Sequence, residues 1–555
     1  MKLKLSLFLY ICLSVTISSF SHSQTQPNAG SIIQENKLGT QPTKPSNLNL
    51  EILKDNRVLE KTGNQVLIKE MEFEGNDVIS NEELKKFLNN YSGQKYYFSE
   101  LLNLTNLVSN FYKERGYSFA RAYLPPQSIK NGVLKIIITE GKYGKINAIG
   151  DKSITSQAKK FLSNLKSGTS IYGPDLEKNL LILDDQPGIR ITPLIRPGEI
   201  IGSGDLDVRL SKEEQQYGLN LNYDTFGNRY TGKERKRISG FYNNPFLFGD
   251  QILFNLLNTD QDMLFGYLNY NFPVLYKGLR GRLGLAHTYY ELGEEFENLK
   301  TNGTADTITL GLQYPFIRSQ KSNLKFDLEY NFKSLYDEQG SAGTYDHKNS
   351  STLPLSLIFD VRDQLGLGAV SYGSLIWTPG ILDLGGGADK SNDSNAKTDG
   401  EFSKVNFDLA RVQQLTNQIS LFGRFSTQFA FDNLDSSESF GLGGVNGVRA
   451  FPTGESFGDE GTLTQIELRY SKTLDNKFKL DPFIFFDAGT IKTNHDNYTT
   501  DANSRNLSGT GFGVRSAYQN MSLDANIAWR VSGGPPKSDS KNDIPIFWIN
   551  FGYQW

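Results

Sequence analysis

The chain has 555 residues, of which 58 are lysine or arginine and 61 are aspartate or glutamate, giving a formal net charge of -3. This length exceeds what one hydrophobic core needs, so at least two separately packed units are expected. The balanced charge excludes the basic footprint of a nucleic-acid-binding protein, and after the first twenty-odd residues no apolar stretch is long enough for a membrane-spanning helix.

The first residues are typical of a secretory signal peptide. Lys2 and Lys4 precede an apolar run over 5–17, and small residues follow up to an expected cleavage at the end of 1–23. An apolar first helix of a cytosolic domain is the alternative. The one cysteine, Cys12, lies in this segment, so the mature chain would carry no thiol, which suits an oxidising compartment and excludes a cysteine metal site.

Residues 24–65 are predicted to be mostly linker. They are rich in Gln, Asn, Thr, Pro and Ser, and Pro27, Pro42 and Pro45 interrupt any long helix. Apolar residues between 48 and 59 lie among charges with imperfect helical periodicity, so this stretch is expected either to form an amphipathic helix or to remain linker.

Residues 66–141 and 142–211 are predicted to be two small modules with the same element order, β-α-α-β-β. Each is just large enough to hold a core, and each sheet leaves an edge at which an extended peptide could add as a strand. The expected elements of the first module are 67–73, 81–90, 99–115, 117–124 and 133–140, and those of the second are 144–149, 153–165, 174–183, 188–195 and 204–210.

Residues 212–555 lose helical periodicity and show short runs of strict alternation, such as YGLNLNY over 217–223 and LTQIELRY over 463–470. About sixteen such runs fit an antiparallel transmembrane β-barrel of sixteen strands. Alternating lipid-facing and water-facing residues would also explain a mean hydropathy of only -0.43. A soluble β-sandwich is the alternative. The last run places Phe551, Tyr553 and Trp555 on one face, as expected for a strand facing lipid.

Two short motifs within 212–555 are the most specific. The first is a glycine-rich loop containing Gly443, Gly444 and Gly447, followed directly by Val448, Arg449, Ala450 and Phe451. The second lies on an expected strand and contains Phe485, Asp487 and Gly489. In the small modules, Tyr123-Leu124-Pro125-Pro126-Gln127 and Pro187-Gly188-Ile189 add to the pattern.

With these motifs, nearly all of the mature chain resembles the TpsB-type outer-membrane transporters of two-partner secretion, the haemolysin-activator and filamentous-haemagglutinin secretion family. The resemblance implies two periplasmic POTRA domains and a barrel with Arg449, on a loop folded into the lumen, contacting Asp487 on the wall. Ala450 stands where the family usually has glycine. An arginine at such a position needs a carboxylate acceptor, although an ordinary surface arginine and a solvated aspartate remain the alternative.

The resemblance further implies a passive pore that captures an unfolded exoprotein, a haemolysin or adhesin of the TpsA type, and passes it to the surface of a Gram-negative cell. The expected partners are this exoprotein, outer-membrane lipid and the barrel-assembly machinery, which would recognise the C-terminal strand, with no nucleic acid. A helix over 48–59 would be a plug of the resting pore. An assembly insertase of the same superfamily, and a diffusion porin or receptor, remain alternatives.

No enzymatic constellation is found in the sequence. The four histidines, at positions 22, 287, 347 and 495, are scattered, and no nucleophile, metal-ligand or phosphate-binding spacing occurs. We therefore expect no catalytic residue, no metal and no cofactor. The charged stretch 360–363 at a strand end is expected to be a solvated turn rather than a row of lumen charges.

Overall fold

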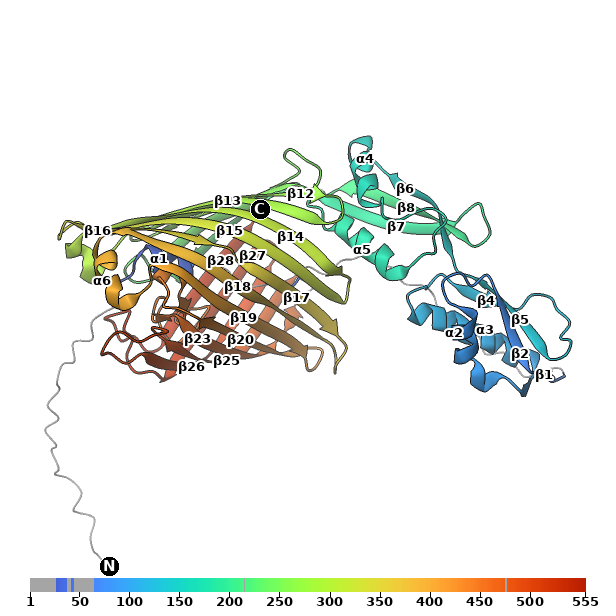
Figure 1. Cartoon of the computed structure of the whole chain (residues 1–555). Coiled ribbons are helices and arrows are strands. Elements are labelled where there is room, and N and C mark those ends of the chain that lie inside the picture. Colours follow the sequence, from blue (N-terminus) through green and yellow to red (C-terminus); the bar gives the residue numbers. More distant parts are fainter. Residues whose placement is uncertain (1–25, 37–40, 44–63, 214, 475–476) are drawn as a thin grey trace, which may run out of the picture.

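The structure, a computed structural model, combines a large β-barrel with two small α/β modules that extend from one end of it (Figure 1). The expected signal peptide and the possible helix over 48–59 lie outside the described residues. None of the described helices has the length and apolar character needed to cross a bilayer. The described residues are 26–36, 41–43, 64–213, 215–474 and 477–555.

The first module contains β1 (Val66–Ile68), β2 (Glu70–Glu74), α2 (Asn81–Phe87), η1 (Asn89–Tyr91), β3 (Gln94–Tyr96), α3 (Phe98–Glu114), β4 (Arg121–Tyr123) and β5 (Val133–Thr139). Its sheet has the order β2-β5-β4, with β2 parallel to β5. The single strand expected over 67–73 is divided, because the backbone N–H groups of Lys69 and Glu70 both donate to Gly132 O while β1 leaves the sheet to pair with β3.

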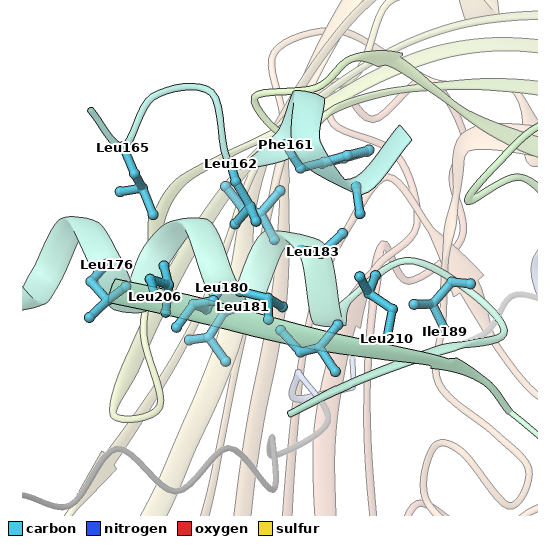
Figure 2. Packing of buried hydrophobic residues seen from close by; sticks show 14 of the residues in the cluster. Phe161, Leu162, Leu165, Leu176, Leu180, Leu181, Leu183, Ile189, Leu206 and Leu210 are labelled. Carbon is cyan, nitrogen blue, oxygen red and sulfur yellow. The ribbon is translucent and has the colours of Figure 1, made fainter. Parts of the chain in front are cut away.

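The second module repeats this topology. It contains β6 (Lys142–Ile149), α4 (Lys152–Phe161), α5 (Gly173–Asp184), β7 (Ile189–Pro197) and β8 (Ser203–Lys212). The sheet order is β6-β8-β7, so the first strand again lies parallel to the last. Figure 2 shows the core, in which Leu176, Leu180 and Leu183 of α5 pack over the sheet. Apolar residues spaced three or four apart place one face of a helix inward, which explains why α5 covers this sheet.

The two modules are joined through a buried carboxylate. Glu140, at the end of the first module, accepts hydrogen bonds from the backbone N–H of Val78 at 2.8 Å, the hydroxyl of Tyr112 at 3.1 Å and the hydroxyl of Ser170 at 3.2 Å. Burial and the nearby Glu140 carboxylate raise the pKa of Tyr112, which therefore stays a donor. Because Ser170 belongs to the second module, this side chain links the two modules, together with the hydrogen bond of 2.8 Å from the backbone N–H of Gly173 to the carbonyl of Gly116.

The sheet of the C-terminal part closes on itself. Within the described residues it contains eighteen strand segments, and because β16 with β17 and β23 with β24 each lie end to end against shared neighbours, they form sixteen strands. This confirms the expected antiparallel barrel and excludes the open β-sandwich. The segments are β9 (Tyr217–Asp224), β10 (Arg235–Asn243), β11 (Gln251–Thr259), β12 (Leu264–Leu275), β13 (Leu279–Glu291), β14 (Thr301–Arg318), β15 (Ser322–Gln339), β16 (Thr344–Thr352), β17 (Leu355–Asp363), β18 (Ala369–Gly386), β19 (Gly400–Gln414), β20 (Ile419–Ala430), β23 (Glu460–Tyr470), β24 (Lys472–Leu474), β25 (Phe478–Lys492), β26 (Ser504–Tyr518), β27 (Met521–Ser532) and β28 (Ile546–Gln554).

Side chains alternate between the outside and the lumen of the barrel. On β14, Ile308, Leu310 and Leu312 point outward and are about half exposed. On β25, Phe486 is 43% exposed whereas its neighbours Phe485 and Asp487 are buried. Because alternate residues of a strand face opposite sides, the outer surface is apolar and the lumen carries the polar side chains.

The two ends of the barrel differ. At the end where the modules attach, which we call the module rim, the connections are short, for example 276–278 and 519–520. At the opposite end, the loop rim, they include the 29-residue connection 431–459 and α6 (Ala388–Ala396). The second module is fixed to the module rim by Arg318, which donates two hydrogen bonds of 2.7 Å to the carboxylate of Asp185.

An additional helix, α1 (Ala29–Glu35), lies inside the barrel near the loop rim (Figure 1). This part of 24–65 was expected to be linker because of its prolines. Pro27, however, precedes the N-cap, Asn28, where proline interrupts no helical hydrogen bond. Asn28 and Ser31 form a reciprocal capping box, and Ile32 is fully buried among lumen residues of the wall.

Candidate functional site inside the barrel

The connection 431–459 folds back into the lumen. Its first turn, η3 (Ser436–Glu438), is held by lysines of the barrel wall: Lys348 Nζ lies 2.6 Å from Asp435 Oδ2, Lys404 Nζ lies 2.7 Å from Glu438 Oε2, and Lys333 also pairs with Glu438. Lys348 is only 2% exposed. Two short strands, β21 (Phe440–Gly441) and β22 (Phe457–Gly458), then pair with each other and close the base of the loop.

The predicted glycines form the turn that presents Arg449. Gly443 and Val448 form an isolated β-bridge, and Gly444 has a φ of +83°, a conformation that a residue with a Cβ rarely adopts. The carbonyl of Gly447 accepts a hydrogen bond of 2.9 Å from Gln465 on the wall. The turn before Arg449 is therefore fixed both within the loop and to the wall.

Arg449 and Asp487 are brought together. Arg449 Nε donates to Asp487 Oδ2 at 2.8 Å, Nη2 donates to Oδ1 at 2.7 Å, and the backbone N–H of the same arginine donates to Oδ2 at 3.1 Å. The guanidinium also lies 3.6 Å from the ring centroid of Phe485. The Asp487 side chain is 0% exposed, so this bidentate pair is formed out of contact with water.

Glu467 on β23 is a partner that the sequence reasoning missed. Arg449 Nη1 donates to Glu467 Oε1 at 2.6 Å, and Arg515 and Arg469 contact the other oxygen at 2.9 and 2.7 Å. Alternation along LTQIELRY places Gln465, Glu467 and Arg469 on one face, a polar row that could have been recognised as lumen-facing.

Ala450 and Gly489 mark close approaches between loop and wall. Ala450 is not among the residues with positive φ, so alanine is unstrained there. Its methyl group faces Gly509 of β26, where an added Cβ would lie 2.3 Å from the Ala450 Cβ. At Gly489 an added Cβ would lie 2.3 Å from the side chain of Leu442. The usual glycine can be replaced at 450 because the facing strand residue, Gly509, leaves the space.

The remaining predicted residues lie on both sides of the wall. Val448 and Phe451 are fully buried in the lumen cluster. On β28 and directly after it, Phe551 and Trp555 are exposed on the outer face. Trp548, an inward residue of the same strand, donates its indole N–H to the carbonyl of Arg449 at 2.7 Å. No local sequence motif predicts this contact.

Helix α1 occupies the lumen beside this loop. The Gln34 amide hydrogen-bonds to the carbonyl of Ser437, and an added Cβ at Gly30 would lie 2.5 Å from the backbone nitrogen of Ser437. On the opposite side, the backbone N–H of Ala29 donates to Asp337 Oδ1 at 2.8 Å. The helix therefore fills the space between the loop and the wall.

The stretch 360–363, expected to be a solvated turn, lies at the end of β17, where Asp360 is buried. Asp360 accepts a hydrogen bond of 3.1 Å from the backbone N–H of Thr43, and Arg362 donates to the carbonyl of Thr43 at 2.6 Å. Alternation turns Asp360 inward, and the N-terminal segment provides its partner. The segment thus contacts the loop rim through α1 and the module rim through Thr43.

The chain matches two models of known protein families. Residues 202–516 match the family model described as haemolysin secretion/activation protein ShlB/FhaC/HecB, and residues 66–141 match a POTRA domain of the ShlB type. The first match covers more than half of the chain.

Individual relatives agree with this match. The heme/hemopexin transporter protein HuxB of Haemophilus influenzae strain 86-028NP is 29% identical over 424 residues, covering 75% of this chain and 74% of the relative. The outer membrane transporter CdiB of Dickeya dadantii is 22% identical over 551 residues, covering 94% and 95%. The solved structure of CdiB from Escherichia coli superimposes with a TM-score of 0.74 at 17% identity, covering 92% and 94%.

Proposed function

The chain belongs to the haemolysin secretion/activation family ShlB/FhaC/HecB, and on this premise we propose that α1 is the plug of its resting pore and that the Arg449 loop is the fixed support on which the plug rests. The family function is two-partner secretion: the protein is an outer-membrane pore that passes an unfolded exoprotein to the cell surface, with its POTRA modules in the periplasm.

The occupied lumen supports the plug assignment most directly. Ala29 and Ile32 are fully buried, and α1 contacts both the wall, at Asp337, and the loop, at Ser437. A seven-residue helix is too short to be stable alone in water, so it depends on these lumen contacts and is lost when they are broken. Such an element is suited to reversible displacement by an incoming chain.

We assign the chain as signal peptide (1–23), linker with the plug (24–65), two POTRA domains (66–141 and 142–211) and barrel (212–555). Capture of the exoprotein is assigned to the POTRA sheets, whose outer strands leave unpaired backbone groups to which an extended segment can pair. The exoprotein is proposed to be of the TpsA type, a haemolysin or adhesin. The outward face of β28 is the proposed recognition element for barrel assembly.

The plug is tested by single-channel conductance in planar bilayers. Gly30→Ala places a methyl group against the backbone of Ser437, so it should weaken docking of α1 and raise the open fraction severalfold. Gly423→Ala is the matched control, because an added Cβ there meets nothing within 4 Å. Equal open fractions for Gly30→Ala, the control and the unchanged protein would contradict the plug assignment.

The secretion function is tested by co-expression with a candidate exoprotein of the TpsA type. Export should require both the POTRA modules and the barrel. A diffusion porin would instead admit sugars into liposomes with α1 in place and without any protein cargo, and such swelling would support that alternative.

A further inference from the structure

A cavity outside the barrel lies where α5 meets the module rim. It has a volume of about 300 Å³ and is bounded by α5, by residues 164–172 and by Lys277 and Tyr314 of the barrel. Four of its lining residues, Asp175, Lys178, Asn179 and Ile182, are spaced as i, i+3, i+4 and i+7 on α5. This spacing places them on one face of the helix, so the cavity wall is a continuous, mainly polar helical surface.

Tyr143 gives this cavity an unsatisfied polar group. The residue lines the cavity and is 4% exposed. Among the residues that the structure describes, its hydroxyl has no hydrogen-bond partner. Buried hydroxyl groups in native proteins are nearly always paired, so the unpaired hydroxyl of Tyr143 is available to a polar group bound in the cavity.

The charges in the cavity define the chemistry of that ligand. Lys178 and Lys277 bring cations, and Asp175 brings a carboxylate. Lys178 Nζ is held at the wall by the carbonyl of Phe316 at 3.1 Å and lies 5.7 Å from the ring centroid of Tyr314. Two cations and a hydroxyl donor suit a phosphate, whereas the carboxylate suits an ammonium group. A ligand with both charges matches the site.

The barrel surface beside the cavity is apolar. Val274 and Leu275 at the end of β12, and Phe316 and Ile317 at the end of β14, are between 43% and 55% exposed, and both pairs lie at register shifts of their strands. Lys160 of α4 donates to the Tyr276 hydroxyl at 3.0 Å at the same rim. Exposed apolar side chains below a belt of tyrosines and lysines are typical of the level at which lipid head groups meet hydrocarbon.

We propose that this cavity binds the head group of phosphatidylethanolamine from the periplasmic leaflet, with the phosphate toward Tyr143, Lys178 and Lys277 and the ammonium group toward Asp175. The acyl chains lie along β12 and β14. The bound lipid adds a contact between POTRA 2 and the barrel beside the Arg318–Asp185 pair, and so stiffens the base of the periplasmic arm. This proposal is independent of the plug assignment.

The test is native mass spectrometry of the delipidated full-length protein, titrated with phosphatidylethanolamine in detergent. Tyr143→Phe keeps the core packing and removes the hydroxyl, and Lys277→Ala removes one cation. Each should lower lipid retention by about fivefold or more, since each deletes a contact with a charged phosphate. The matched controls Tyr123→Phe and Lys130→Ala, exposed on POTRA 1, should retain lipid like the unchanged protein. Phosphatidylcholine, whose quaternary nitrogen donates no hydrogen bond, should bind more weakly.

Three outcomes would overturn the proposal. The first is a Tyr143→Phe protein that retains lipid like the unchanged protein, because the hydroxyl would then make no contact with the lipid. The second is equal binding of phosphatidylcholine, which would remove the Asp175 contact. The third is competition by soluble glycerophosphoethanolamine at the concentration at which the lipid itself binds, which would make the ligand a soluble phosphate ester rather than a membrane lipid.

Discussion

Replacement of Arg449 by alanine should release the lumen loop. Asp487 would lose both guanidinium hydrogen bonds and keep only the one from the backbone N–H of residue 449, while its side chain stays 0% exposed. Removal of one partner of a buried ion pair costs about 3–5 kcal/mol, and loss of the cation–π contact with Phe485 adds about 1 kcal/mol. Glu467 would still be paired by Arg515 and Arg469, so the loss falls mainly on Asp487.

The same reasoning predicts a rescue. In Arg449→Ala with Asp487→Asn, the uncharged amide oxygen still accepts the backbone hydrogen bond, so about 2 kcal/mol should be recovered. Arg449→Ala with Glu467→Gln is the matched control, because it leaves the buried Asp487 charge in place and gives Arg469 and Arg515 a weaker partner, so no recovery is expected. Urea unfolding in detergent, followed by tryptophan fluorescence, measures these differences, since the Trp548 indole is bonded to the Arg449 carbonyl. Unfolding of Arg449→Ala at the original urea concentration, or equal effects of the two second substitutions, would refute the assignment of the cost to Asp487.

Three further predictions follow from single contacts. Gly509→Ala should impair folding and secretion because its Cβ would overlap that of Ala450, and the exchange Ala450→Gly with Gly509→Ala should restore both; absence of rescue would mean that the clash is elsewhere. Lys348→Ala leaves the Asp435 carboxylate, only 6% exposed, without its closest cation, so cleavage by added protease within 431–459 should increase, whereas unchanged cleavage would argue against this anchor. Glu140→Ala should broaden the distance distribution between spin labels on the two POTRA domains, because three donors lose their shared acceptor, and an unchanged width would place the rigidity in other contacts.

Much of the fold could be predicted from the sequence because a barrel strand is a local pattern. Each alternating run, such as 217–223 or 463–470, specifies its own two faces without reference to distant residues. The POTRA repeat was recognisable for the same reason. Helix α1 was missed because it buries few residues and depends on wall residues such as Tyr290, more than 250 positions away. No periodicity within seven residues can reveal such a partner.

A contact in the site could be predicted only where both of its residues lie in recognisable motifs. Arg449 and Asp487 could be paired because each lies in a recognisable pattern. Glu467, Trp548 and Lys348 could not, because their roles depend on which strands face each other across the lumen, a property of barrel closure rather than of local sequence. The sequence also could not explain why alanine is accepted at position 450, because only the structure shows that Gly509 provides the space for its methyl group.

The Arg449 motif of the lumen loop and α1 are attached to different sectors of the barrel wall. Arg449 and its neighbours are bound by β23, β25, β26 and β28, whereas α1 packs on residues of β11, β13, β14 and β15. If α1 leaves the lumen as proposed, the space that it vacates is bordered on one side by β11 and β13–β15 and on the other by the loop that carries Arg449. A polypeptide in transit would then pass along Tyr290 and Leu335 without disturbing the Arg449–Asp487 ion pair. One side of the pathway would stay fixed, and the other would open each time a chain passes.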